Sequence, residues 1–75
     1  MNILLIDDEL DILEGMLDGV DFERLGFENV YTAQSAAQAK RLLESRSIDI
    51  MVTDIEMPGE SGLDLLCWVR DRRLE

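Results

Sequence analysis

The segment ILLIDDE, residues 3–9, places four consecutive apolar residues directly before three acids, Asp7, Asp8 and Glu9. A short apolar run without polar alternation is typical of a strand that is buried on both faces of a sheet. The run extends back to the start of the chain, so we predict a strand over residues 2–6. Its carboxyl end brings the acids to one edge of the sheet, and the rest of the chain decides what they meet there.

Two further segments have the composition of strands, and helical patterns separate them. Residues 28–33, ENVYTA, and residues 48–53, IDIMVT, contain the β-branched and aromatic residues that strands favour. Apolar residues recur at helical spacing after the first acids, after Ser35 and after Ser61. Strands that alternate with helices form parallel sheets through right-handed crossovers. We therefore predict an α/β fold with one parallel sheet in a single small domain.

The starts and apolar sides of the three helices can also be predicted. Two residue pairs have the capping pattern of a helix start, in which the side chain of each residue accepts a hydrogen bond from the backbone N–H of the other. They are Ser35 with Gln38 and Ser61 with Asp64. The residues expected on the apolar sides are Leu13, Met16, Leu17 and Val20, then Ala36, Ala39, Leu42 and Leu43, then Leu63, Leu66 and Val69. Gly15 and Gly19 weaken the first helix, and we expect them to allow close helix packing.

Composition sets limits on partners and location. The 75 residues carry a formal net charge of −10, and 47% of them are hydrophobic. This charge disfavours direct contact with nucleic acid, because such affinity comes from Lys and Arg on phosphates. No apolar run approaches the roughly 20 residues of a membrane-spanning helix, and no signal peptide is visible. Cys67 is the only cysteine, which fits a reducing compartment, so we expect a cytoplasmic protein.

The third predicted strand also runs into an acid, Asp54. If the first and third strands are neighbours, Asp7, Asp8 and Asp54 meet at the carboxyl edge of the sheet, where open parallel sheets bind ligands. At about 5 Å and an effective dielectric of about 20, two carboxylates repel by on the order of 3 kcal/mol, which favours bound protons or a cation. An all-oxygen cluster with room for water favours Mg²⁺. Alternatively, acids after a strand simply start a helix, the interpretation we prefer for Glu9.

The two segments that carry the most specific pattern are LLIDDE at residues 4–9 and IDIMVTDIEMPGESGLDLL at residues 48–66. With these segments the chain resembles the N-terminal part of a response-regulator receiver domain of two-component signalling. FERLGFENV at residues 22–30 further resembles receivers attached to AraC-type DNA-binding domains. The resemblance implies a three-layer, flavodoxin-like (CheY-like) fold with sheet order 2-1-3. Residues 1–75 would then form a truncated receiver domain without strands four and five.

The resemblance also implies a role for each acid. Asp54 matches the phosphoacceptor, which receives a phosphoryl group from a sensor histidine kinase. Asp8 matches the direct magnesium ligand and Asp7 the acid that contacts the metal through water. The backbone carbonyl of Glu56 matches the third protein ligand. In the family, a Ser or Thr on strand four and a Lys on strand five hold the phosphoryl group, and no residue of this chain matches them. We therefore expect impaired phosphotransfer.

If the sheet ends with the third strand, residues 48–53 form an edge strand. Residues 48–53 then carry unpaired backbone groups, which favour pairing with another chain. We expect a homodimer, in its simplest form with this strand antiparallel to its own copy, or alternatively with exposed sheet and helix surfaces packed face to face. The alternative function is a structural or assembly fragment that self-associates through the third strand with no phosphotransfer. An enzyme is not expected, because the chain has no histidine for acid–base chemistry and no glycine-rich phosphate loop.

Overall fold

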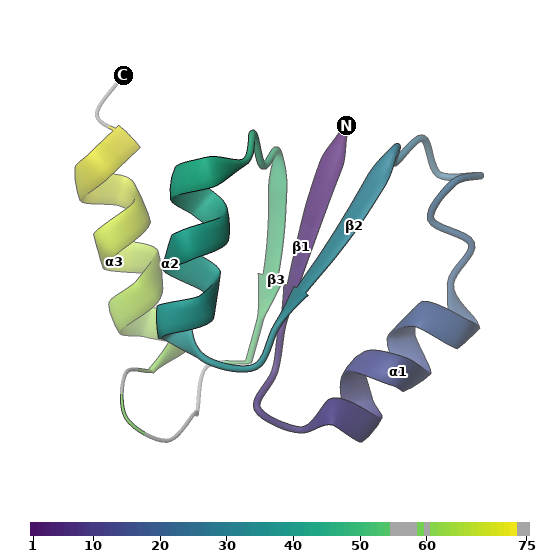
Figure 1. The fold of residues 1–75 in the computed structure, drawn as a ribbon, viewed down its shortest axis with the longest axis horizontal. Helices are drawn as coiled ribbons and strands as arrows, with labels where there is room; N and C mark the ends of the chain where they lie inside the picture. The colour runs from purple at the N-terminus through teal and green to yellow at the C-terminus, as the bar shows by residue number, and fades with distance from the viewer. Residues whose placement is uncertain (55–58, 60, 74–75) are drawn as a thin grey trace.

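The computed structural model describes residues 1–54, 59 and 61–73, in which three strands alternate with three helices. The strands are β1 (Asn2–Ile6), β2 (Asn29–Ala33) and β3 (Ile50–Thr53), and the helices are α1 (Leu10–Gly19), α2 (Ala36–Ser45) and α3 (Gly62–Arg73). All strand pairs are parallel, and the sheet order is β2-β1-β3 (Figure 1). The predicted α/β class and the sheet order 2-1-3 are confirmed.

β1 lies in the centre of the sheet and is buried on both faces. Its residues Ile3, Leu4, Leu5 and Ile6 are at most 5% exposed. Because side chains alternate along a strand, Leu4 and Ile6 pack in a cluster with α2 and α3 on one face. Ile3 and Leu5 pack against Leu13 of α1 on the other face. This alternation builds the three layers seen in Figure 1, with α1 on one side of the sheet and α2 and α3 on the other.

The starts of α2 and α3 confirm both predicted capping pairs. Ser35 Oγ accepts a hydrogen bond from the Gln38 N–H at 3.2 Å, while Gln38 Oε1 accepts one from the Gln34 N–H at 2.9 Å. The return bond therefore reaches the residue before Ser35. At α3 the exchange is reciprocal, because Ser61 Oγ accepts from the Asp64 N–H at 3.2 Å and Asp64 Oδ2 accepts from the Ser61 N–H at 3.3 Å. The Ser61–Asp64 pair thus acts as a helix cap.

The predicted apolar sides of α1 and α3 are partly wrong. In α3 the fully buried leucine is Leu65, whereas Leu63 and Leu66 are 57% and 44% exposed. Several leucines of α3 lie on overlapping helical stripes, so spacing alone does not choose the stripe that faces the sheet. In α1 Leu13 is buried but Leu17 is exposed, because a ten-residue helix contacts this narrow sheet over a short stretch. None of the described helices is long and apolar enough to cross a membrane.

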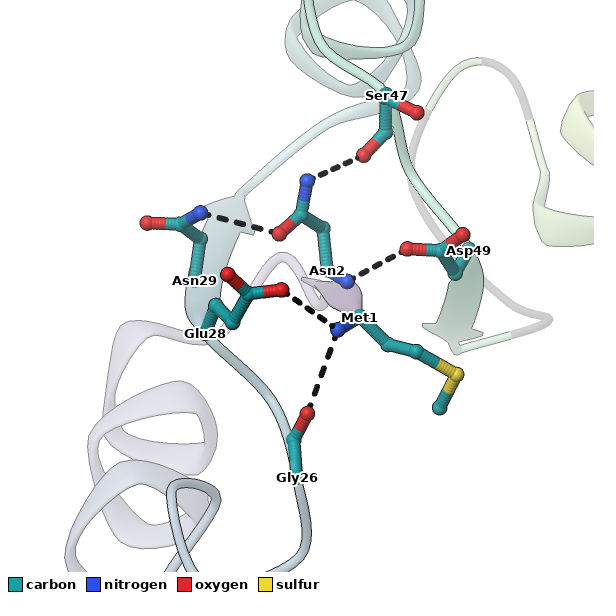
Figure 2. A network of polar contacts seen from close by, with 7 residues as sticks. All are labelled: Met1, Asn2, Gly26, Glu28, Asn29, Ser47 and Asp49. Carbon is teal, nitrogen blue, oxygen red and sulfur yellow. Dashed lines mark hydrogen bonds and ion pairs between the residues drawn. The ribbon is translucent and has the colours of Figure 1, made fainter.

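A polar network joins the amino ends of the three strands (Figure 2). The Asn2 N–H donates to Asp49 Oδ2 at 2.7 Å, and Asn2 Nδ2 donates to the Ser47 carbonyl at 2.6 Å. Asn29 Nδ2 donates to Asn2 Oδ1 at 3.0 Å. The Asp49 N–H in turn donates to the Asn2 carbonyl at 2.9 Å. These bonds hold the segment before β3 against β1, and regular pairing starts only after Asp49, two residues later than predicted.

The prediction that Gly15 and Gly19 allow close helix packing is wrong, since a Cβ atom at either position would meet nothing within 4 Å. Gly15→Ala should therefore raise the free energy of unfolding by about 1 kcal/mol, because alanine is the better helix former. Urea unfolding followed by circular dichroism, at one protein concentration, measures the change. The control is Gly26→Ala, which should destabilise because φ is +96° at Gly26. An unchanged or lower stability of Gly15→Ala would show that α1 packs differently.

Candidate metal and phosphoacceptor site

Asp7 and Asp54 lie at the same edge of the sheet because their strands are parallel neighbours. In the register of β1 and β3, Ile6 lies opposite Thr53, so the next residue of each strand is an aspartate. The Asp54 N–H donates to the Ile6 carbonyl at 3.1 Å, and the Asp7 N–H donates to the Ala33 carbonyl of β2 at 3.1 Å. The backbone positions of both acids are thus fixed by bonds that continue the ladders of the sheet.

The three predicted acids converge at this edge. Asp7, Asp8 and Asp54 each offer a carboxylate oxygen, and these oxygens all lie within 4.8 Å of one another. Asp7 is half-buried, while Asp8 and Asp54 are exposed. Like charges at such separations repel one another. The predicted juxtaposition of the three acids is confirmed, and a divalent cation among them would offset their repulsion.

Asp7 is oriented by a hydrogen bond that was not predicted from the sequence. Its Oδ1 accepts a hydrogen bond from the Glu9 N–H at 2.9 Å. An aspartate that bonds the backbone two residues on is a common turn element, so an Asp shortly before a helix was the available signal. Glu9 occupies the N-cap position of α1, but its side chain makes no capping bond. Glu9 is therefore the residue at which α1 begins, but its side chain does not cap the helix. Its backbone N–H helps to hold the Asp7 carboxylate in place.

The predicted third ligand, the backbone carbonyl of Glu56, lies outside the described residues and stays a prediction. Met57 and Pro58, which follow Glu56, also lie outside the described residues. Gly59 is described, and its φ of +79° is in the region that favours glycine. Gly59 thus has the backbone conformation expected of a glycine in a turn between β3 and α3.

The chemistry of the donor set fits magnesium. The three side chains offer only oxygen atoms, and two of them are exposed, which leaves room for the water molecules that Mg²⁺ retains. The chain has no histidine, and its one cysteine, Cys67, is exposed in α3. The nitrogen and sulfur ligands that distinguish zinc sites therefore do not belong to this cluster.

Comparison with known proteins decides the family. The model of the response regulator receiver domain matches residues 3–75. The chain belongs to the response regulator receiver domain family. The resemblance inferred from residues 4–9 and 48–66 is thereby confirmed, while the likeness of residues 22–30 to receivers with AraC-type DNA-binding domains stays a prediction.

Two curated relatives are longer proteins with related names. An uncharacterised response regulatory protein of Staphylococcus epidermidis is 36% identical over 69 residues, which are 92% of this receiver domain and 28% of the relative. The uncharacterised transcriptional regulatory protein YesN of Bacillus subtilis is 39% identical over 64 residues, 85% of this chain and 17% of that protein. The receiver domain described here thus spans a minor part of the length of these relatives.

A solved structure supports the fold. The response regulator protein TrrA of Thermotoga maritima, in complex with Mg²⁺-BeF, matches with a TM-score of 0.84 and 32% sequence identity. The match covers 97% of this chain and 61% of that chain. The predicted CheY-like receiver fold is therefore confirmed, and this structural neighbour carries magnesium together with a beryllium fluoride group.

Replacing Asp8 should separate repulsion from metal binding. We expect Asp8→Asn to raise the melting temperature in metal-free, low-salt buffer, because it removes one of three clustered charges. The same variant should lose most of the stabilisation that wild-type protein gains from Mg²⁺, since ligands that bind the folded state raise its stability. Differential scanning calorimetry measures both effects. Glu23→Gln is the control, because Glu23 is an exposed acid outside the cluster, and equal behaviour of the two variants would contradict the site.

Proposed function

We propose that this receiver domain accepts a phosphoryl group on Asp54 from a sensor histidine kinase, with Mg²⁺ bound by Asp7, Asp8 and Asp54. The observation that carries the proposal is the meeting of these three carboxylates within 4.8 Å at the carboxyl ends of β1 and β3. Membership of the receiver family supports it. In this proposal the chain is the cytoplasmic signalling part of a transcriptional regulator, without catalytic turnover. Its net charge of −10 supports the absence of direct nucleic-acid contact.

The position of Asp54 allows it to accept the phosphoryl group directly. A carboxylate oxygen of Asp54 forms a bond to phosphorus while the bond from phosphorus to the donor imidazole nitrogen breaks. Asp54 is exposed at the sheet edge, so a donor side chain can reach it, and the bond from its N–H to Ile6 fixes its backbone. Bound Mg²⁺ supplies neutralisation of the charge on the transferred oxygens. Asp54 is thus the acceptor, and the neighbouring acids hold the metal.

The surroundings of Asp7 and Asp8 support different roles in metal binding. Asp8 is exposed, which suits a direct ligand. Asp7 is half-buried, and its Oδ1 already accepts a bond from the Glu9 N–H, which suits contact through water. The backbone carbonyl of Glu56 would complete the protein ligands.

The test is phosphorylation by a small phosphodonor. Incubation with phosphoramidate and Mg²⁺ should add one phosphoryl group, detected by intact-protein mass spectrometry. Asp54→Asn should remain unmodified, and the control Glu23→Gln should react like the wild type because Glu23 lies outside the acidic cluster. Modification of Asp54→Asn, or equal modification without divalent metal, would contradict the proposal. A wild type that binds Mg²⁺ yet never becomes modified would remove the phosphoacceptor role and leave the metal site.

A second proposed function, self-association, is favoured by a separate observation. Among the described strands β3 pairs only with β1, and no described strand lies on its other side. Ile50 and Val52 of this strand are 38% and 44% exposed. Edge strands with exposed apolar residues readily pair with another chain. We propose that two copies form a homodimer through β3, and a stable monomer at micromolar concentration in light scattering would contradict this.

A further inference from the structure

We infer that Asp49, just before β3, is a positioning residue for the acidic site at the opposite end of that strand. Through its hydrogen bonds to the backbone of Asn2 it selects the register of β3 against β1 in which Asp54 joins the other two acids. The inference rests on the proposed metal site and adds to it a residue that contacts neither the metal nor the phosphoryl group.

Asp49 binds both backbone groups of Asn2. The Asn2 N–H donates to Asp49 Oδ2 at 2.7 Å (Figure 2), and the Asp49 N–H donates to the Asn2 carbonyl at 2.9 Å. The carboxylate thus accepts an N–H that a regular parallel ladder would pair with a backbone carbonyl. Hydrogen bonds to an ionised acceptor are stronger than those between neutral groups. The contact therefore closes the ladder directly before its first regular pair, Ile3 with Ile50.

The apolar side chains of β3 do not by themselves decide its register. A slip of two residues toward the amino end of β1 would set Val52 beside Ile3, where Ile50 lies in the structure. One β-branched side chain would replace another, and a slip of two residues keeps every side chain on its own face. Thr53 would take the place of Met51, and both are half-buried. β3 has only four residues, so few ladder bonds oppose this slip.

The slip would take Asp54 out of the acidic site. Asp54 follows the last pair of the ladder, Ile6 with Thr53, and after the slip it would lie beside Leu5. Two residues of a strand span roughly 6.6 Å. The carboxylate oxygens of the three acids lie within 4.8 Å of one another, so a displacement of that size would end their convergence. A shift that apolar packing tolerates would therefore remove the metal site.

The carboxylate of Asp49 opposes slips in both directions. In the slip described above, Met51 would take the place of Asp49, and its thioether is too weak an acceptor to replace the carboxylate at the Asn2 N–H. In the opposite slip, Asp49 would take the place of Met51, which packs against the apolar cluster of β1, α2 and α3. A carboxylate there would lose part of its hydration without a charged partner from β1.

Magnesium titration of two Asp49 variants tests the inference. In Asp49→Asn the amide oxygen still accepts the Asn2 N–H, whereas Asp49→Ala has no acceptor. Both variants lose the same charge, so its long-range effect on Mg²⁺ affinity is equal in the two. Isothermal titration calorimetry should show severalfold weaker Mg²⁺ binding by Asp49→Ala than by Asp49→Asn, because apparent affinity falls with the fraction of molecules in the competent register.

A stability control separates a lost register from general weakening of the fold. Ala37 is exposed in α2, outside the sheet, and Ala37→Gly lowers helix stability. This variant should lower the melting temperature and leave the Mg²⁺ affinity unchanged. All titrations are made at a temperature at which circular dichroism shows each variant to be folded.

NMR measures the register without metal. In the wild type and in Asp49→Asn, the methyl groups of Val52 should give NOE contacts mainly with those of Leu5, its partner in the register. In Asp49→Ala, contacts between Val52 and Ile3 should grow at the expense of those with Leu5. Unchanged contacts in Asp49→Ala, together with Mg²⁺ affinity equal to that of Asp49→Asn, would overturn the inference and leave the metal site.

Two further outcomes are decisive. A wild type that does not bind Mg²⁺ would overturn the proposed site and with it the positioning role, even if the NOE contacts show that Asp49 sets the register. If Asp49→Ala does not fold, the pair Asn2→Pro and Asn2→Ala replaces it. Proline removes the N–H that Asp49 accepts and is tolerated at the first residue of a strand, while alanine keeps that N–H. Equal Mg²⁺ affinity of these two variants would overturn the inference.

Discussion

The burial of β1 on both faces is the constraint on which the rest of the structure depends. Four successive apolar residues of this strand are at most 5% exposed, and full burial of each such side chain is worth about 1.5–3 kcal/mol. A strand this apolar needs a neighbour on each side and helices on each face. Parallel pairing with β2 and β3 supplies the neighbours, and it aligns the carboxyl ends of all three strands. The repulsion among the acids is a cost that this burial offsets.

The polar groups at the amino ends of the strands have a different role from those at the carboxyl ends. At the amino ends Asp49 accepts a hydrogen bond from the Asn2 N–H. The Asn2 side chain forms hydrogen bonds with Ser47, before β3, and with Asn29 of β2 (Figure 2). These groups hold the strands in register. At the carboxyl ends of the strands the backbone bonds place Asp7 and Asp54, and the three carboxylates converge there. The strand register is thus fixed at the amino ends, and the acids that repel one another are held together at the carboxyl ends.

Sequence predicted the parts of this structure that depend on local chemistry or on simple alternation. The apolar run of β1, the caps at Ser35 and Ser61, and the meeting of Asp7 with Asp54 all follow from patterns of a few residues. The buried side of α3 did not, because its leucines form overlapping stripes and only the packing against the sheet and α2 selects Leu65. The bond from the Glu9 N–H to Asp7, and the Asn2 network that delays the start of β3, depend on three-dimensional proximity and have weak signals or none in the sequence.

β3 links the proposed signalling and assembly functions. Its last pair with β1 positions Asp54, while its opposite side is the edge through which we propose that two copies pair. Because Asp54 directly follows the pairing residues, the site and the edge share one short segment.

Paramagnetic broadening by Mn²⁺, a hard cation that uses the same oxygen ligands as Mg²⁺, is the most direct test of the account. Amide signals of isotopically labelled protein would be followed by NMR at increasing, substoichiometric Mn²⁺. The account predicts that the signals of Asp7, Asp8 and Asp54 disappear first. The signals of Asn2 and Asp49, roughly 15 Å away at the opposite edge of the sheet, should remain sharper. Broadening that begins at Asn2 and Asp49, or that spreads evenly over all exposed acids, would contradict the convergence of the three aspartates on one metal site.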